Sequence, residues 1–374
     1  MKKTYIDTAM ERIAPDLILK GGNVVDVFSG RVIKADVIIK DGIICGVGSY
    51  SGENEQDVSG KYIMPGFIDS HVHIESSMTQ PSEYAKAVMP HGITTVIADP
   101  HEITNVCGED GLEFMLKSAK NIPLDVNLML PSCVPATPFE HTGANLDAKT
   151  TQKLAPKFFG IGEMMNYPGI VSGDDETLGK LCLDIIDGHA PLLSGHELDA
   201  YASVGIKTDH ECSVVEEMTE KISKGMYILL REGTLSLDVA KLIKGVTPYT
   251  LRRCAFCTDD RFVGEIIRDG SIDHCIRKAV SLGLNNIDAI IMATLNACEI
   301  YGMKNKGAIA PSYVADIVVA DDLNLSSISQ VYKNGKLVCE NGKALFECET
   351  VDNSKVTNTV HLPKISDDFF KTDV

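Results

Sequence analysis

Two histidines, His71 and His73, end a short apolar run that starts at Phe67. If residues 67–73 form a strand, the two side chains are i and i+2 and point to the same face. Two imidazoles on one face of a strand end are suited to hold a metal ion, whereas an isolated H-x-H pair also occurs among core histidines. The preceding Pro65-Gly66 pair is a turn signal, so the run is bounded as a strand should be.

Other candidate strands also end in side chains that bind metals. Because the carboxyl ends of parallel barrel strands meet on one face, we expect these side chains to gather there. Neutral imidazoles bind Zn, Fe, Mn or Ni, and a carboxylate can bridge two divalent ions. Paired ions lower the pKa of a bound water and supply a hydroxide near neutral pH. Enough ligands for two ions come from His71, His73, Glu163, His189, His210 and Asp259.

The elements that must position these residues lie between residues 64 and 304, where short apolar runs alternate with helical patterns. This alternation predicts βα units and a parallel sheet. Eight strands in a segment of this length predict an α/β fold, a (β/α)₈ TIM-like barrel. A doubly wound open sheet is the alternative, but no G-x-G-x-x-G follows the first strand. The expected strands are 67–73, 93–99, 124–130, 158–164, 183–188, 205–209, 226–231 and 254–258.

Three segments of this middle part have clear helical patterns. Pro81–Met89 starts with a proline, which suits the first turn of a helix. Ser213–Lys224 carries its apolar residues on one face, with Ser213 as the expected N-cap. Asn286–Tyr301 is expected to form one longer helix.

Both ends of the sequence are rich in β-branched residues, and we expect one small β-sandwich assembled from the two. Gly21-Gly22, Ser29-Gly30 and Asp41-Gly42 are expected hairpin turns. The predicted domains are the sandwich at 1–63 and 305–346, the barrel at 64–304 and a polar tail at 347–374. The expected strands of the sandwich are 17–20, 23–27, 31–33, 35–39, 43–47, 307–310, 315–320 and 331–339.

The composition is that of a globular protein, with 44% hydrophobic and 23% charged residues. A formal net charge of -17 argues against binding nucleic acid through a basic face. The first residues lack the apolar run of a signal peptide, and no apolar stretch is long enough to span a bilayer. The 11 cysteines have no disulfide-framework spacing. We therefore expect a cytoplasmic protein with reduced thiols and no membrane partner.

Five stretches together resemble the adenine deaminases of the metal-dependent amidohydrolase superfamily. The resemblance extends over roughly residues 16–345. The stretches are 65–77 (PGFIDSHVHIESS), 90–102 (PHGITTVIADPHE), 188–191 (GHAP), 209–211 (DHE) and 253–261 (RCAFCTDDR).

The resemblance implies a binuclear site with Mn²⁺ or Fe²⁺ favoured and Zn²⁺ also compatible. His71, His73 and Asp259 would bind one ion, His189 and His210 the other, and Glu163 would lie between them. Many members of the superfamily have a carboxylated lysine at this bridging position, whereas Glu163 agrees with the adenine deaminase pattern.

The implied reaction is hydrolytic deamination of adenine to hypoxanthine and ammonia by a metal-bound hydroxide. Asp259 would accept the proton of the nucleophile and pass it to the leaving amine. Glu75, Glu102 and Glu232 are the candidates for protonating the ring nitrogen, and His101 and Arg231 are candidates for binding the substrate. For these five residues, a structural salt bridge is the competing interpretation.

Full-length relatives carry a further large domain after the small β unit, so the sequence is expected to represent a shortened member. The alternatives are hydrolysis of another cyclic amide or amidine, and a catalytically silent truncated member. The expected partners are a small purine base and further copies of the chain in a homo-oligomer.

Overall fold

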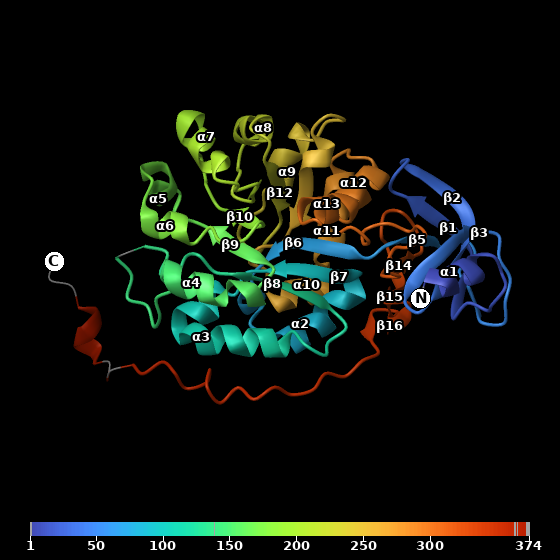
Figure 1. Cartoon of the computed structure of the whole chain (residues 1–374), viewed down its shortest axis with the longest axis horizontal. Helices are drawn as coiled ribbons and strands as arrows, with labels where there is room; N and C mark the ends of the chain where they lie inside the picture. Colours follow the sequence, from blue (N-terminus) through green and yellow to red (C-terminus); the bar gives the residue numbers. More distant parts are fainter. Residues whose placement is uncertain (1, 138, 363, 365, 372–374) are drawn as a thin grey trace.

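The computed structural model describes residues 2–137, 139–362, 364 and 366–371. It contains a TIM-like α/β barrel, and beside it a mostly antiparallel sheet formed by both ends of the sequence (Figure 1). Within the described ranges, the search for a helix that is both long and apolar enough to cross a membrane finds none.

The barrel contains all eight strands that the sequence predicts. They are buried along almost their whole length, which explains why they appear in the sequence as apolar runs rather than as alternating patterns. The strands are β6 (Phe67–Val72), β7 (Ile93–Ala98), β8 (Asp125–Leu130), β9 (Gly160–Met164), β10 (Ile186–Gly188), β11 (Thr208–Asp209), β12 (Tyr227–Arg231) and β13 (Cys254–Cys257).

Strand pairing divides the barrel wall into two pieces, β10-β9-β8-β7-β6 and β11-β12-β13. The seam between β6 and β13 is joined by backbone contacts, because Asp259 N–H donates to the carbonyl of His71 over 2.9 Å. At the other seam, no strand pairing among the described residues links β10 to β11. There, the N–H of Gly188 donates to Oγ1 of Thr208 over 3.1 Å, so side chains make the link.

Helices follow the strands as a βα alternation requires. They are α2 (Pro81–Val88), α3 (His101–Ser118), α4 (Ala148–Leu154), α5 (Tyr167–Ser172), α6 (Asp175–Gly179), α7 (Gly195–Ser203), α8 (Val215–Ser223), α9 (Val239–Leu242), α10 (Val263–Asp269), α11 (Ile272–Ser281), α12 (Asn286–Met292) and α13 (Leu295–Ile300). Short 3₁₀ turns are η1 (Ile74–Ser77), η2 (Met89–His91), η3 (Ala155–Lys157), η4 (Ile243–Gly245) and η5 (Leu251–Arg253).

Two helix predictions were wrong in detail. Ser213 is not an N-cap, because the backbone stays extended through Val214 and α8 starts at Val215. The expected helix Asn286–Tyr301 is broken into α12 and α13 at Thr294, whose φ of -138° is not helical. The buried hydroxyl of Thr294 donates to the carbonyl of Ile290 over 2.6 Å, so the side chain competes with the helix backbone for this acceptor. Neither Gly nor Pro marks the break in the sequence.

The two ends of the sequence do meet in one sheet, in the order β17-β16-β15-β14-β5-β1-β2-β3, with β4 beside β1. The join is the antiparallel pair of β5 and β14. Its packing as a two-layered sandwich stays a prediction. The strands are β1 (Leu17–Asp26), β2 (Arg31–Lys40), β3 (Ile43–Gly48), β4 (Glu55–Asp57), β5 (Tyr62–Pro65), β14 (Ile317–Ala320), β15 (Ile328–Lys333), β16 (Lys336–Glu340) and β17 (Lys343–Ala344).

Gly21-Gly22 is not a hairpin turn, contrary to the sequence prediction. β1 continues through it, and its register against β2 shifts between Leu19 and Gly22. Gly21 has a φ of 72°, and its N–H donates to Oδ1 of Asp36 over 2.8 Å, so the pair forms a bulge. The expected strand at 307–310 is also absent. The expected strand at 331–339 is instead a hairpin, because a turn at Asn334-Gly335 divides it into β15 and β16.

The N-terminal residues form α1 (Lys2–Ala9), and the C-terminal segment after β17 runs extended along the α3 side of the barrel (Figure 1). Its contacts with the barrel include the ion pairs Glu347–Lys86 at 3.1 Å and Lys355–Asp110 at 2.7 Å. A 3₁₀ turn, η6 (Asp367–Phe370), lies in its last part.

Candidate metal centre

His71, in β6, and His73, directly after it, are buried and face each other through one nitrogen each. His71 and His73 place their Nε2 atoms 3.1 Å apart. Their Nδ1 atoms are already engaged: His71 donates to Asp187 over 2.6 Å, and His73 to the carbonyl of Asp99 over 2.9 Å. A neutral imidazole that donates from Nδ1 has its lone pair on Nε2. This distance fits either a proton or a metal ion held between the two nitrogens, so the pair is suited to bind a metal ion.

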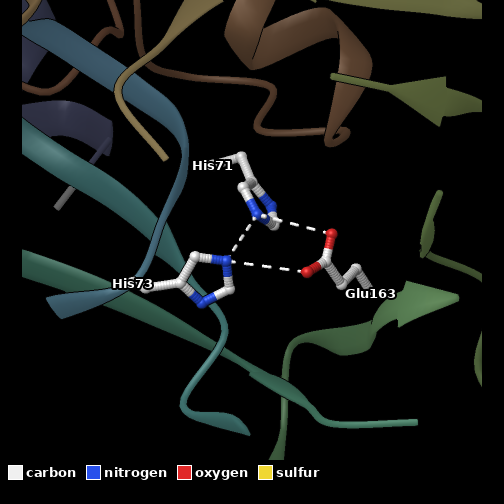
Figure 2. A group of neighbouring side chains, drawn as sticks. All are labelled: His71, His73 and Glu163. Carbon is white, nitrogen blue, oxygen red and sulfur yellow. Dashed lines mark hydrogen bonds and ion pairs between the residues drawn. The ribbon is translucent and has the colours of Figure 1, made fainter. Parts of the chain in front are cut away.

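Glu163 on β9 faces these histidines across the barrel (Figure 2). Its Oε1 is 3.7 Å from Nε2 of His73, and its Oε2 is 3.8 Å from Nε2 of His71. The carboxylate is buried. Burial raises the pKa of Glu163, but the neighbouring imidazoles, His210 foremost, bring it well below its usual value. The group is therefore an anion at neutral pH.

His189 and His210 complete the opposite side of Glu163. His189 directly follows β10, and His210 directly follows β11. Nδ1 of His189 and Nε2 of His210 each lie 2.8 Å from Oε2 of Glu163. Nδ1 of buried His210 has no hydrogen-bond partner, while Nε2 faces the Glu163 carboxylate. A buried imidazole that faces a carboxylate in this way is suited to bind a metal ion. Glu163 thus has one side toward each histidine pair.

Asp259 follows β13 and completes the cluster. Its backbone has a φ of 54°, and the N–H of His73 donates to its carbonyl over 3.2 Å. Oδ1 lies 3.2 Å from Nε2 of His73 and 3.6 Å from Nε2 of His71. Burial raises the pKa of Asp259, but the hydrogen bond with His73 and the surrounding imidazoles lower it far below its usual value.

The residues present fit a pair of divalent ions. The ligand atoms form overlapping groups that could each hold an ion, and Glu163 belongs to two of them, His71–His73–Glu163 and Glu163–His189–His210. Imidazole and carboxylate together suit Zn, Mn and Fe. The structure therefore brings together all six ligands expected from the sequence.

Asp99 and Asp187 also contribute to the centre, and sequence reasoning assigned them no role. Asp187 accepts from Nδ1 of His71, while Oδ2 of Asp99 accepts from the N–H of Glu163 over 2.8 Å. Carboxylates in this position orient a metal-binding side chain and increase its basicity. The signal was present, since both are aspartates at or just after strand ends in the barrel.

Replacing Asp187 with Asn should weaken metal binding by about 10- to 100-fold, because the amide is a poorer acceptor for His71 Nδ1–H. Competition with a chelator would measure the loss. Asp184→Asn, an exposed position before β10, is the matched control and should bind metal as the unmodified chain does. Equal affinities in both variants would show that Asp187 does not orient His71.

Residues 62–338 match the sequence profile of the Amidohydrolase family. The chain belongs to this family. It is 49% identical over 371 residues to an adenine deaminase of Clostridium acetobutylicum, and 50% identical over 359 residues to adenine deaminase 2 of Desulfotalea psychrophila. These alignments cover 97% and 94% of this amidohydrolase chain but 65% and 62% of the relatives. The chain thus spans somewhat less than two thirds of the length of these curated relatives.

Solved amidohydrolase-like structures share the fold at low sequence identity. The β-aspartyl dipeptidase of Fervidobacterium islandicum AW-1 superposes with a TM-score of 0.64 and 20% identity, covering 90% of this chain and 99% of the other. An enamidase of the amidohydrolase superfamily gives 0.64 and 18%, covering 88% and 97%. At these identities the likeness supports the TIM-like α/β fold alone.

Three of the other predicted site residues lie beside the ligands. Glu102 Oε2 is 3.4 Å from Nδ1 of His73, and His101 Nδ1 is 3.7 Å from Oε1 of Glu163. Glu75, on η1, is partly buried at this side, and its Oε2 atom, like that of Glu102, is buried without a hydrogen-bond partner. Burial, together with the charge of Glu102, raises the pKa of Glu75 to about 8.

The two predicted residues on and after β12 face different ways. Arg231 donates from Nη1 to Oδ2 of Asp259 over 2.9 Å and also pairs with Glu211 and Asp238. Glu232 pairs instead with Lys278 of α11. The structure therefore brings Arg231 to the ligand cluster but gives Glu232 a partner on an outer helix.

Proposed function

We propose that the chain catalyses hydrolytic deamination of adenine to hypoxanthine and ammonia at a binuclear site. The observation that carries this proposal is the six-residue ligand cluster with Glu163 between two histidine pairs. The high identity to curated adenine deaminases supports the choice of substrate. It remains a proposal for this chain, which spans only part of those relatives.

The proposed ligands of the first ion are His71, His73 and Asp259, and those of the second are His189 and His210, with Glu163 shared. Mn²⁺ or Fe²⁺ are the proposed ions, and Zn²⁺ is compatible with the same atoms. When bound, a pair of such ions lowers the pKa of water so that it can act as a nucleophile near neutral pH.

Asp259 is the proposed proton acceptor. Its Oδ2 accepts a hydrogen bond from Arg231 Nη1 over 2.9 Å. Oδ1, which lies nearer the histidines, is therefore the atom proposed to accept the proton of water and to pass it to the leaving amino group. In this proposal Arg231 holds the carboxylate in orientation and does not itself bind adenine. This is a narrower role than the substrate contact expected from the sequence.

Glu75 and Glu102 are the proposed partners of the purine ring. In each, Oε2 is buried and makes no hydrogen bond, although Oε2 of Glu102 lies 3.4 Å from Nδ1 of His73. A ring nitrogen next to the reacting carbon needs such a hydrogen-bonding group. His101 bonds Asp99 over 3.0 Å and thereby supports the carboxylate that holds the backbone of Glu163. Oε2 of Glu232 is also buried without a hydrogen bond, but Glu232 is left out because its Oε1 pairs with Lys278 of α11.

We also propose that the chain is organised as expected from its sequence, with the barrel at 64–304, the small β unit at 1–63 and 305–346, and a polar tail at 347–374. The pairing of β5 with β14 supports this division, because it joins the two halves of the β unit in one sheet.

Ammonia release from adenine tests the function directly. The purified chain would be freed of metal, reconstituted with Mn²⁺ or Fe²⁺, and assayed with metal content read on the same sample. About two ions per chain with turnover would support the proposal. Two ions without turnover of adenine would overturn the substrate and favour another cyclic amide or amidine. No ions and no turnover would favour a catalytically silent chain.

A further inference from the structure

The two histidine pairs of the centre are supported very differently by the backbone. His71 lies in β6, which pairs with β7 and is tied to β13. His73 directly follows the end of this strand, and its N–H donates to the carbonyl of Asp259. His189 and His210 instead follow two separate strands, β10 with three residues and β11 with two. These are the strands between which the described chain has no pairing. Something other than the sheet must set the distance between His189 and His210.

A fully buried lysine from α8 lies behind this seam. The Nζ of Lys221 donates to the carbonyl of Ala190 over 2.6 Å and to Oε1 of Glu217 over 2.6 Å, and it also forms an ion pair with Asp209. Its relative exposure is 0%. All three N–H donors of the ammonium group are therefore used, and two of the acceptors directly flank metal ligands: Ala190 follows His189, and Asp209 precedes His210.

The two carboxylates of this cluster hold both ligand loops by their backbone. Glu217 accepts from the N–H of Leu192 over 2.7 Å through Oε1, and from the N–H of Ser213 over 3.3 Å through Oε2. Asp209 accepts from the N–H of Glu211 over 2.9 Å. One buried unit thus joins the loop after β10 to the loop after β11. We call Lys221, Asp209 and Glu217 the Lys221 triad.

The ammonium group of Lys221 is stabilised in its charged form by Asp209. Burial alone lowers the pKa of Lys221, but the charge of Asp209 more than reverses this and the pKa rises. Removing one member of a buried ion cluster leaves an uncompensated charge, so the arrangement is far more constraining than an exposed ion pair. Lys224, just after the same helix, pairs with Asp199 at 2.6 Å but is partly exposed, and it provides a direct comparison.

We propose that the Lys221 triad positions His189 and His210 and thereby sets the affinity of the centre for its second metal ion. This rests on the proposed binuclear site. The triad touches neither substrate nor metal, so its members are positioning residues. Because the first histidine pair is held by the end of β6 and by the backbone of Asp259, loss of the triad should weaken the binding of one ion and not of both.

The experiment compares Lys221→Met and Glu217→Gln with Lys224→Met as the matched control. Metal-free protein would be titrated with Co²⁺, and the visible absorption and ion content would give the affinity for each of the two ions. Lys221→Met should weaken the second ion by about 10- to 100-fold and leave the first unchanged, as loss of support around a ligand does. Glu217→Gln should show a smaller loss in the same direction, and Lys224→Met none.

Thermal unfolding of the metal-free variants separates positioning from folding. If Lys221→Met does not fold, Glu217→Gln, which keeps the shape of the side chain, decides the question. Equal weakening of both ions, or wild-type affinity for both in a folded variant, would overturn the proposal. Fewer than two ions in the unmodified chain would instead overturn the binuclear site itself, so the two failures are distinguishable.

Discussion

Replacing Glu163 with Gln is expected to leave fewer than two ions per chain and to lower turnover of adenine by about 10³-fold or more. Oε2 of Glu163 lies 2.8 Å from both His189 and His210, and Oε1 faces His73. Glutamine keeps the size of the side chain but has one oxygen instead of two and no charge. It therefore cannot serve both ions or balance their charge.

Metal analysis and ammonia release on the same sample would measure both effects. Glu113→Gln, on the exposed face of α3, removes the same charge far from the ligands and is the control. Two ions per chain and normal turnover in Glu163→Gln would show that this carboxylate does not join the two halves of the centre.

The second large effect is expected for Asp259→Asn. Asparagine preserves the backbone contacts with His71 and His73, but its amide cannot accept the proton of the attacking water. Loss of a general base typically costs 10²- to 10⁴-fold in rate, so kcat should fall by about that factor. The oxygen of asparagine can still face His73, so we expect little loss of bound metal. The fold-change in kcat should therefore be larger than the fold-change in metal content.

Asp260→Asn is the neighbouring control, since Asp260 is exposed and accepts from the hydroxyl of Ser76 instead of facing the ligands. Its kcat should remain close to that of the unmodified chain. If Asp259→Asn lost metal in proportion to its lost activity, Asp259 would be acting only as a ligand, and the proton would have to be accepted elsewhere.

Local sequence patterns were sufficient for the barrel and for its six candidate ligands. Buried parallel strands need apolar side chains on both faces, so they appear as short apolar runs that can be recognised without a structure. The ligands then followed from one rule, that the carboxyl ends of the strands share a face. His71, Glu163 and His210 are separated by long stretches of sequence, yet each stands at or next to the end of such a run.

Contacts between distant segments could not be predicted from local sequence patterns. Gly21-Gly22 has the composition of a turn, and only the acceptor Oδ1 of Asp36 on the neighbouring strand turns it into a bulge. Arg231 and Glu232 are adjacent and both charged, but at the end of β12 the first side chain contacts Asp259 and the second contacts Lys278. Nothing in the local sequence distinguishes these outcomes.

By itself, the sequence determined the βα alternation, the strand-end ligands and the family resemblance, because periodicity and residue type at strand ends are local properties. Only the tertiary structure decided which groups support those ligands. Asp187 bonds His71, Asp99 holds Glu163, and Lys221 joins the loops of His189 and His210. Each of these contacts depends on how helices and strands pack, and packing is set by the whole chain at once.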